Sequence, residues 1–243
     1  MKTLLCDLVT DIRMLFRVPV SAFFTVVFPS LMLIIMMASY GNPDIGSGIR
    51  LSDKYVLIAS GMGLVPLSLI TFPSWICSSV ESSYLLRLKY LHVSLARVAT
   101  SNALAHMVIA LCGTAVTFAD TRIPGLPALI AYSLQLIVVT ASLMLFGAAL
   151  AFIVRQTAVV IAVGLVLMFV VYMLCGVFGD YSAMPAGLQA AGNLIPLKYL
   201  MNDGFDVWTS TRLMIPQLWA TSAAWAGTSA VVAVIAARRR LRR

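Results

Sequence analysis

Charged residues are scarce in this sequence, and long stretches have none. Only 11% of the 243 residues are Asp, Glu, Lys or Arg, whereas 61% are hydrophobic, which excludes a soluble domain of ordinary composition. The charge-free stretches are 18–43, 55–80, 98–119, 123–154, 156–179 and 213–237. A helix needs about 20 apolar residues to cross about 30 Å of hydrocarbon, so each stretch can hold one span. The sequence therefore predicts an all-α membrane protein.

Motifs for chemistry are missing as well. No lysine directly follows a glycine, which excludes a phosphate-binding P-loop, and neither HExxH nor GxSxG occurs. The two histidines are 14 residues apart and make a poor metal site. Apart from Arg97, which stands at the end of one predicted span, no Asp, Glu, Lys or Arg lies within a span, which disfavours ion-coupled transport. We therefore expect no catalytic, cofactor or metal site in this chain, and we expect His106 to be a neutral histidine bonded to a neighbouring helix.

The spans and the charges between them predict a topology. Six transmembrane helices are expected at about 21–40, 55–78, 96–118, 127–152, 157–178 and 217–236. Six spans place both ends of the chain on one side, and that side then holds twelve of the 17 basic residues. The positive-inside rule makes this side cytoplasmic. The net charge of +8 thus indicates lipid headgroups as the partner rather than nucleic acid.

The segment before the first span predicts an interfacial helix. TLLCDLVTDIRMLFR, residues 3–17, places its leucine, valine, isoleucine and phenylalanine residues on one helical arc. Asp7, Asp11 and the arginines occupy the other arc, and only Met14 falls outside this division. Such a pattern is typical of a helix lying in the membrane surface.

Two segments between the spans differ from their surroundings. ESSYLLRLKYLHVS, residues 81–94, is amphipathic and basic, and it predicts a short helix exposed to the cytoplasm. MPAGLQAAGNLIPLKYL is apolar but contains Pro185 and Pro196, which can start and end a short helix at the outer surface. Lys198 is expected to keep the next turn near water. The region 184–205 is therefore predicted to form short re-entrant external helices before the last span.

Soft or aromatic side chains in the second and fifth spans can line an adaptable cavity. Helix packing alone explains them equally well. They are Ser68, Thr71, Phe72, Met168, Phe169 and Tyr172.

Three stretches, in this order, resemble the permease subunits of type-2 ATP-binding-cassette (ABC) exporters, a family of drug, antibiotic and polysaccharide efflux systems. FRVPVSAFFTVVFPSLMLII, residues 16–35, is similar to the family's Arg-x-Pro entry into a Phe-Pro-containing first span. The loop at 81–94 resembles E-x-G-T-L-x-x-L-x-x-x-P-V-S, with departures at Ser83, Tyr84 and His92. The external segment resembles L-P-x-W-L-Q-x-x-x-x-x-x-P-L-x-Y, and its matching residues are Pro185, Leu188, Gln189, Pro196, Leu197 and Tyr199.

The resemblance implies how such a protein works. Two permeases, identical or homologous, would pair in a bacterial cytoplasmic membrane, and each would dock a separate cytoplasmic ABC ATPase subunit that binds ATP and Mg. The first inner loop would be the coupling helix, with contacts from Glu81, Tyr84, Leu85, Arg87, Leu88 and Lys89. Spans two and five would line the path, and the external segment would cap it.

The short external loops favour a small amphiphile, drug or peptide as the exported substrate. A membrane anchor or assembly factor that recruits a cytoplasmic partner through the basic loop is the alternative. An intramembrane enzyme is disfavoured because the catalytic motifs are missing.

Overall fold

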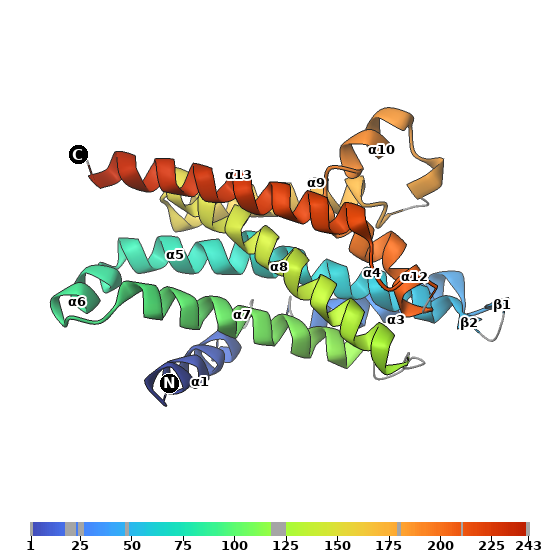
Figure 1. The fold of residues 1–243 in the computed structure, drawn as a ribbon, viewed down its shortest axis with the longest axis horizontal. Coiled ribbons are helices and arrows are strands. Elements are labelled where there is room, and N and C mark those ends of the chain that lie inside the picture. Colours follow the sequence, from blue (N-terminus) through green and yellow to red (C-terminus); the bar gives the residue numbers. More distant parts are fainter. Residues whose placement is uncertain are drawn as a thin grey trace.

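The computed structural model describes residues 2–17, 23, 27–46, 49–117, 125–178, 181–209 and 211–241, which are mostly helical. The long helices lie along one another in a single elongated bundle (Figure 1). Five of the described helices are long and apolar enough to cross a membrane. They cover Leu51–Glu81, Arg97–Val116, Leu126–Val154, Thr157–Leu174 and Pro216–Ala236. The second to sixth predicted spans are thereby confirmed in length and composition.

The first predicted span, 21–40, is described only in part. Helix α3, Phe28–Tyr40, is apolar but has 13 residues, and residues 18–22 and 24–26 lie outside the described part of the chain. The count of six spans therefore stays a prediction. A short antiparallel pair, β1 (Asp44–Gly46) and β2 (Ile49–Arg50), follows α3.

The second span forms the centre of the bundle. It consists of α4 (Leu51–Pro66), the π-helix η2 (Leu67–Thr71) and α5 (Phe72–Glu81), which follow one another without a break. In its most apolar 18-residue segment, 83% is buried within the protein, against 17% in the corresponding segment of Pro216–Ala236. Around it pack α7 (Leu95–Thr117), α8 (Leu126–Val154) and α9 (Thr157–Leu174). The long helix α13 (Pro216–Leu241) packs on α8 at the edge of the bundle.

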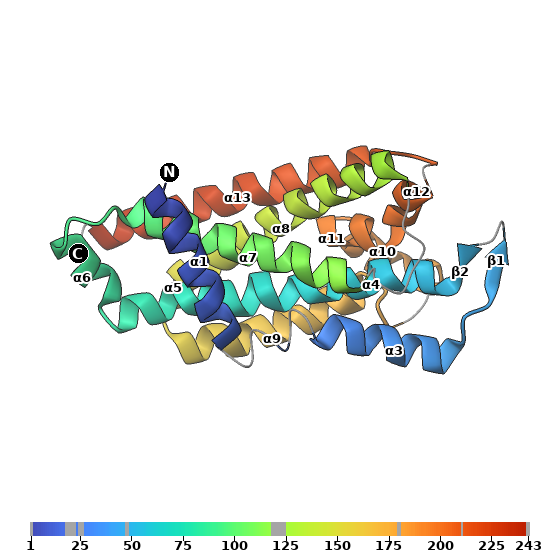
Figure 2. The ribbon, with the colours of Figure 1, turned by 90° about the horizontal axis from the view of Figure 1, so that it is seen from below.

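Helix α1, Lys2–Arg17, lies across the bundle and packs on α7 (Figure 2). The prediction of a helix here is confirmed, and Leu15 on its apolar arc is buried. The two acids of the opposite arc contact α7. Asp7 Oδ2 pairs with Arg97 Nε at 2.9 Å, and Asp11 Oδ2 accepts a hydrogen bond from Ser101 Oγ at 2.6 Å. The first turns of α7 carry polar groups that attract these carboxylates.

The two ends of the bundle differ in structure. Helix α6, Tyr84–Tyr90, lies at the same end as the C-terminal part of α13, and α1 lies toward that end (Figures 1 and 2). The β1–β2 pair and a series of short helices lie at the opposite end. These helices are η3 (Tyr181–Ala183), α10 (Ala186–Gly192), α11 (Pro196–Lys198), η4 (Tyr199–Asp203) and α12 (Gly204–Trp208).

The two prolines of this short-helix region act differently from each other. Pro185 precedes α10, as predicted. The prediction that Pro196 ends the same helix is wrong, because α10 stops at Gly192 and Pro196 is the first residue of α11. The fixed φ of proline suits the first position of a helix, where no N–H is needed.

Candidate functional site

The central helix contains two prolines, and the first of them leaves a carbonyl without its helical donor. Pro66 has no N–H, so the carbonyl of Met62 receives no α-helical hydrogen bond. The hydroxyl of Tyr172 in α9 donates to this oxygen at 2.6 Å. Hydrocarbon offers no water as a substitute, so a backbone group in a span must find its partner within the protein. Tyr172 thus connects α9 to the middle of the central helix.

The second proline follows a stretch with π-helical winding. Pro73 cannot donate to the Leu69 carbonyl, and in the preceding turn the Phe72 N–H donates to Leu67 O, five residues back. Single π-turns inside α-helices are rare overall, and those that occur are often found at functional sites. The Ser68 hydroxyl within this turn is buried and has no hydrogen-bond partner among the described residues. We call Leu67–Thr71 the π-turn.

Two glycines allow neighbouring helices to approach the π-turn closely. A Cβ on Gly147 of α8 would collide with the Ser68 carbonyl oxygen, and a Cβ on Gly164 of α9 would collide with that of Leu69. Glycine Cα–H groups that pack against carbonyl oxygens can make weak hydrogen bonds to them. Small residues permit this kind of close helix packing in membranes. The carbonyls of the π-turn therefore face glycines on both sides.

The predicted path residues gather near the π-turn, with one exception. Ser68, Phe72, Met168 and Tyr172 are buried, and Thr71 is half-buried. Phe169 is 58% exposed and points away from the centre of the single chain. The reason is helical geometry: positions 168 and 172 share a face of α9, whereas position 169 is turned by about 100°. Five of the six candidates thus pack inside one chain, and Phe169 lies on its outer surface.

His106 lies next to this group on α7. It is fully buried, and the Phe72 ring meets its imidazole edge-on with centroids 5.2 Å apart. The expected bond to a neighbouring helix is absent among the described residues: Nδ1 contacts the Asn102 carbonyl of its own helix at 2.8 Å, and Nε2 has no partner. Backbone geometry within α7 decides this contact, since positions four apart are stacked on one face.

Glu81 connects the end of α5 to the start of α9, that is, the second predicted span to the fifth. Its carboxylate accepts two hydrogen bonds, from the Thr157 backbone N–H at 2.9 Å and from Thr157 Oγ1 at 2.5 Å. Thr157 is the first residue of α9, where the N–H groups lack helical partners and the helix dipole favours negative charge. Glu81 therefore caps α9 from the end of α5, and its predicted contact with an ATPase stays a prediction.

Helix α6 is enclosed by two residues with left-handed backbone conformations. Ser83 precedes it with φ 56°, and His92 follows it with φ 56°. Residues other than glycine adopt such angles only at a cost of roughly 1–2 kcal/mol. Ser83 stands where the resembling family has glycine, which adopts this angle without cost. His92 stands where proline is common, and proline cannot adopt a positive φ. The turn after α6 therefore differs from the one that the pattern implies.

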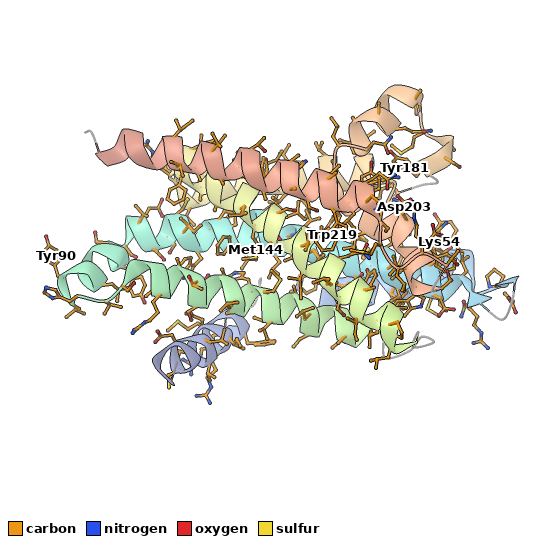
Figure 3. All side chains as sticks on the ribbon, in the orientation of Figure 1. Lys54, Tyr90, Met144, Tyr181, Asp203 and Trp219 are labelled. Carbon is orange, nitrogen blue, oxygen red and sulfur yellow. The ribbon has the colours of Figure 1, made fainter. Side chains whose placement is uncertain are left out.

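The side chains of α6 project from the end of the bundle. Tyr84 is 43% exposed, Arg87 is exposed, and Leu88 is half-buried. The side chains of Leu85 and Lys89 lie outside the described part of the chain. Tyr90 is 82% exposed and lies at the extreme end of the molecule (Figure 3). A helix with exposed aromatic and basic groups, fixed at both ends, is a surface suited to a protein partner.

At the opposite end, the short helices are held together by hydrogen bonds. Tyr181 Oη donates to Gln189 O at 2.6 Å, and Gln189 Nε2 donates to Met184 O at 2.7 Å. Burial and then the charge of Asp203 raise the pKa of Tyr199, whose hydroxyl donates to Asn193 O at 2.9 Å. This region thus forms a folded unit rather than a loose loop.

Lys198, which was expected to keep the next turn near water, is itself buried in this unit. Its side chain is 11% exposed, and Nζ pairs with Asp203 Oδ2 at 3.2 Å. The ammonium also lies 4.5 Å from the ring centroid of Tyr199 and 4.9 Å from that of Tyr181. One carboxylate and two aromatic faces replace its hydration. Tyr181 and Asp203 lie close together in Figure 3.

The residues of the external segment that matched the family pattern lie in the short helices or directly before them. Pro185 and Gln189 are described above, and Leu188 is half-buried in α10. Pro196, Leu197 and Tyr199 are all buried. The second half of the matched pattern therefore lies in the interior of the short-helix unit, whereas Pro185 is exposed at its surface.

Sequence analysis missed the residues that shape the π-turn. Pro66, Pro73, Gly147 and Gly164 were not among the candidates, although each interrupts an apolar helical stretch. Proline and glycine inside such a stretch signal a kink or a close approach. Which helix approaches which carbonyl is not visible in the sequence.

Comparisons with known proteins point to one family. A family model described as ABC-2 type transporter matches residues 8–203. The matched region runs from α1 to the end of η4 and so includes the π-turn, α6 and most of the short-helix unit. No curated protein and no solved structure matches the chain.

Proposed function

Because the chain belongs to the ABC-2 type transporter family, the permease components of ABC transporters, we propose that it is the permease of an exporter. It forms the path for a small amphiphile, drug or peptide, and a separate cytoplasmic subunit hydrolyses ATP. Its six spans pair with a second permease in a bacterial cytoplasmic membrane, with both ends of the chain inside. The observation that carries the proposal is the connection from α6 through Glu81 to α9 and the π-turn.

Helix α6 is the contact that receives movement of the ATPase. Its exposed Tyr84 and Arg87 can bind a groove and an acidic group on the partner, and the turns at Ser83 and His92 define its orientation. Because α6 directly follows α5, a push on α6 acts on the end of the central helix. Thr157, bonded to Glu81, would move with it.

The π-turn is the element that yields when the inner ends move. It interrupts the regular α-helical hydrogen bonding of the central helix. The neighbouring helices contact it through Gly147 and Gly164, which have no side chains to keep the backbones apart. Helices bend where their backbone hydrogen bonding is interrupted, which makes the π-turn a hinge. Movement of α5 and α9 can then change the packing around Ser68 and Phe72 while α4 and the short-helix unit keep their contact.

An apolar groove between α5, α7 and α8 supports an amphiphilic substrate. Its volume is about 460 Å³, and Phe72, Ala103, Met107 and Met144 contribute to its walls. Met144 lies near the middle of the bundle (Figure 3). Methionine and small residues make walls that adapt to ligands of different shape. Phe72 connects this groove to the π-turn.

Charge reversal on α6 tests the coupling contact. Arg87→Glu should lower ATP hydrolysis by the purified permease–ATPase complex roughly tenfold, because a close charge pair across an interface is worth about 1.5 kcal/mol or more. Arg212→Glu is the matched control, since Arg212 is also exposed but lies between α12 and α13 at the opposite end. Equal hydrolysis by the two variants would show that α6 is not the coupling helix.

Transport itself is measured with inverted membrane vesicles that contain both subunits. ATP-dependent uptake of an amphiphilic fluorescent dye or peptide, lost when the ATPase is omitted, is the expected result. A complex that forms but neither hydrolyses ATP in response to any amphiphile nor takes one up would indicate a membrane anchor instead.

A further inference from the structure

A cavity lies between α1, the π-turn, α5, α7 and α9, close to the Glu81–Thr157 contact. Its volume is about 280 Å³. Residues from α1, α5, α7 and α9 contribute to its walls, among them Asp11, Met14, Ser74, Trp75, Asn102 and Thr157. This space is separate from the groove beside α7 and α8 and is large enough for a group of several heavy atoms. We call it the inner cavity.

One wall of the inner cavity presents a buried amide oxygen without a partner. Asn102 is 2% exposed, and its Oδ1 forms no hydrogen bond among the described residues. A buried polar atom left without a partner costs free energy, so native structures rarely contain one. An amide oxygen only accepts hydrogen bonds, and its missing partner is therefore a donor.

Asp11 contributes a carboxylate to the wall of the same cavity. Asp11 receives hydrogen bonds from the hydroxyl of Ser101, at 2.6 Å, and from the side chain of Asn102. No lysine or arginine pairs with it within the described ranges. Asp7, one helical turn earlier, is paired with Arg97. Burial raises the pKa of Asp11, as expected for a negative charge that lacks a counter-ion.

Two hydroxyl groups of the wall can accept hydrogen bonds as well. The Ser74 hydroxyl donates its hydrogen to Thr71 O at 2.8 Å, and the Thr157 hydroxyl donates to Glu81. Their oxygens keep lone pairs that can accept a bond. The cavity thus presents a carboxylate, an amide oxygen and at least two hydroxyl oxygens that can accept hydrogen bonds, and no lysine or arginine of the described residues lines it.

The apolar wall suits the carbon chain of a cationic ligand. Trp75 contributes an indole surface over which an ammonium group is attracted, and Met14 adds a flexible thioether. Met14 is the residue that did not fit the division of α1 into two arcs, and its position at the cavity accounts for it.

We propose that the inner cavity binds a protonated primary amine through Asp11 and Asn102. Its three N–H donors match the acceptors of the wall, and its charge compensates the carboxylate. The amine is either the headgroup of an ethanolamine lipid, since α1 has the pattern of a membrane-surface helix, or a soluble amine. An occupant at this position joins α1 to α5 and α9 and so stiffens the contact region of the partner ATPase.

The test measures binding to the full chain without its ATPase. The purified protein is placed in nanodiscs of phosphatidylcholine, whose quaternary ammonium has no N–H donor. Phosphatidylethanolamine is then included in the lipid, or free ethanolamine is added to the buffer. Thermal unfolding reports stabilisation, and native mass spectrometry counts retained ethanolamine lipids.

Asp11→Asn removes the charge and keeps the shape, and Asp7→Asn is its matched control on the same helix. Asp11→Asn should weaken binding roughly tenfold or more, because a hydrogen bond to a charged group contributes about 1.5–3 kcal/mol. Asp7→Asn should bind like the unaltered protein. Should Asp11→Asn fail to fold, Ser78→Leu fills the mouth of the cavity and leaves Asp11 intact.

The arms of the experiment separate the sources of the amine. Stabilisation by phosphatidylethanolamine alone identifies a lipid headgroup, and stabilisation by free ethanolamine identifies a soluble amine as sufficient. Equal behaviour of the unaltered protein and both cavity variants would overturn the proposal, as would the lack of a response to either amine. Neither of these results would affect the permease assignment, which rests on the family match and is tested separately through α6 and ATP hydrolysis.

Discussion

Substituting Gly147 by alanine tests whether close packing on the π-turn stabilises the bundle. The added Cβ would overlap the carbonyl oxygen of Ser68 and lie 3.3 Å from Cδ of Pro73. A backbone carbonyl in the most buried helix cannot rotate away as a flexible side chain can. Overpacking of this kind costs about 1–3 kcal/mol. Alanine regains up to ~1 kcal/mol through its higher helix propensity. We therefore expect a net loss of roughly 1–2 kcal/mol.

Thermal unfolding of the purified protein in nanodiscs measures this loss. A chain of this size changes its Tm by about 2–4 °C per kcal/mol, so Gly147→Ala should lower Tm by roughly 2–8 °C. Gly227→Ala in α13 is the matched control, because a Cβ there meets no atom within 4 Å. That variant should unfold at the original temperature or slightly above it. If the two variants unfold at the same temperature, α8 does not pack on the π-turn as described.

Three further substitutions are tested in the same unfolding assay. Tyr172→Phe should destabilise by about 1–3 kcal/mol, because the Met62 carbonyl loses the hydrogen bond that the Tyr172 hydroxyl donates; an unchanged Tm would mean that another group replaces the hydroxyl. Ser83→Gly should stabilise by up to ~1 kcal/mol, since glycine adopts the positive φ without strain, and a lower Tm would contradict this conformation. Trp225→Phe should cost about 0.5–1.5 kcal/mol by removing the bond from Nε1 to Leu194 O at 2.8 Å, unless the short-helix unit is held to α13 by packing alone.

Much of the fold could be predicted because the bilayer imposes it locally. A span must be a continuous apolar helix of sufficient length, and both requirements are properties of consecutive residues. The second to sixth spans therefore agree with the charge-free stretches, and α1, α6 and α10 appear where amphipathicity or proline indicated helices. Residues 18–20, which join α1 to the first predicted span, by contrast lie outside the described part of the chain.

Sequence reasoning was incomplete where the surroundings of a side chain were inferred from its charge alone. Lys198 was expected to keep a turn near water, but a carboxylate and two aromatic rings enclose it. Asp11 was placed on the polar arc of α1, and the structure adds its contact with α7. Charge alone indicates that a group needs solvation, and it does not say whether water or protein provides it.

The sequence by itself determined that the chain is a bundle of membrane helices with a basic loop, interrupted helices before the last span, and no catalytic motif of its own. Hydrophobic length and charge distribution suffice for this, because insertion into a bilayer acts on each segment separately. Only the tertiary structure decided that Tyr172 donates to the carbonyl left open by Pro66, that Glu81 caps α9, and that Asp11 and Asn102 share a cavity. Each of these contacts joins residues far apart along the chain, and only the packing of helices brings them within bonding distance.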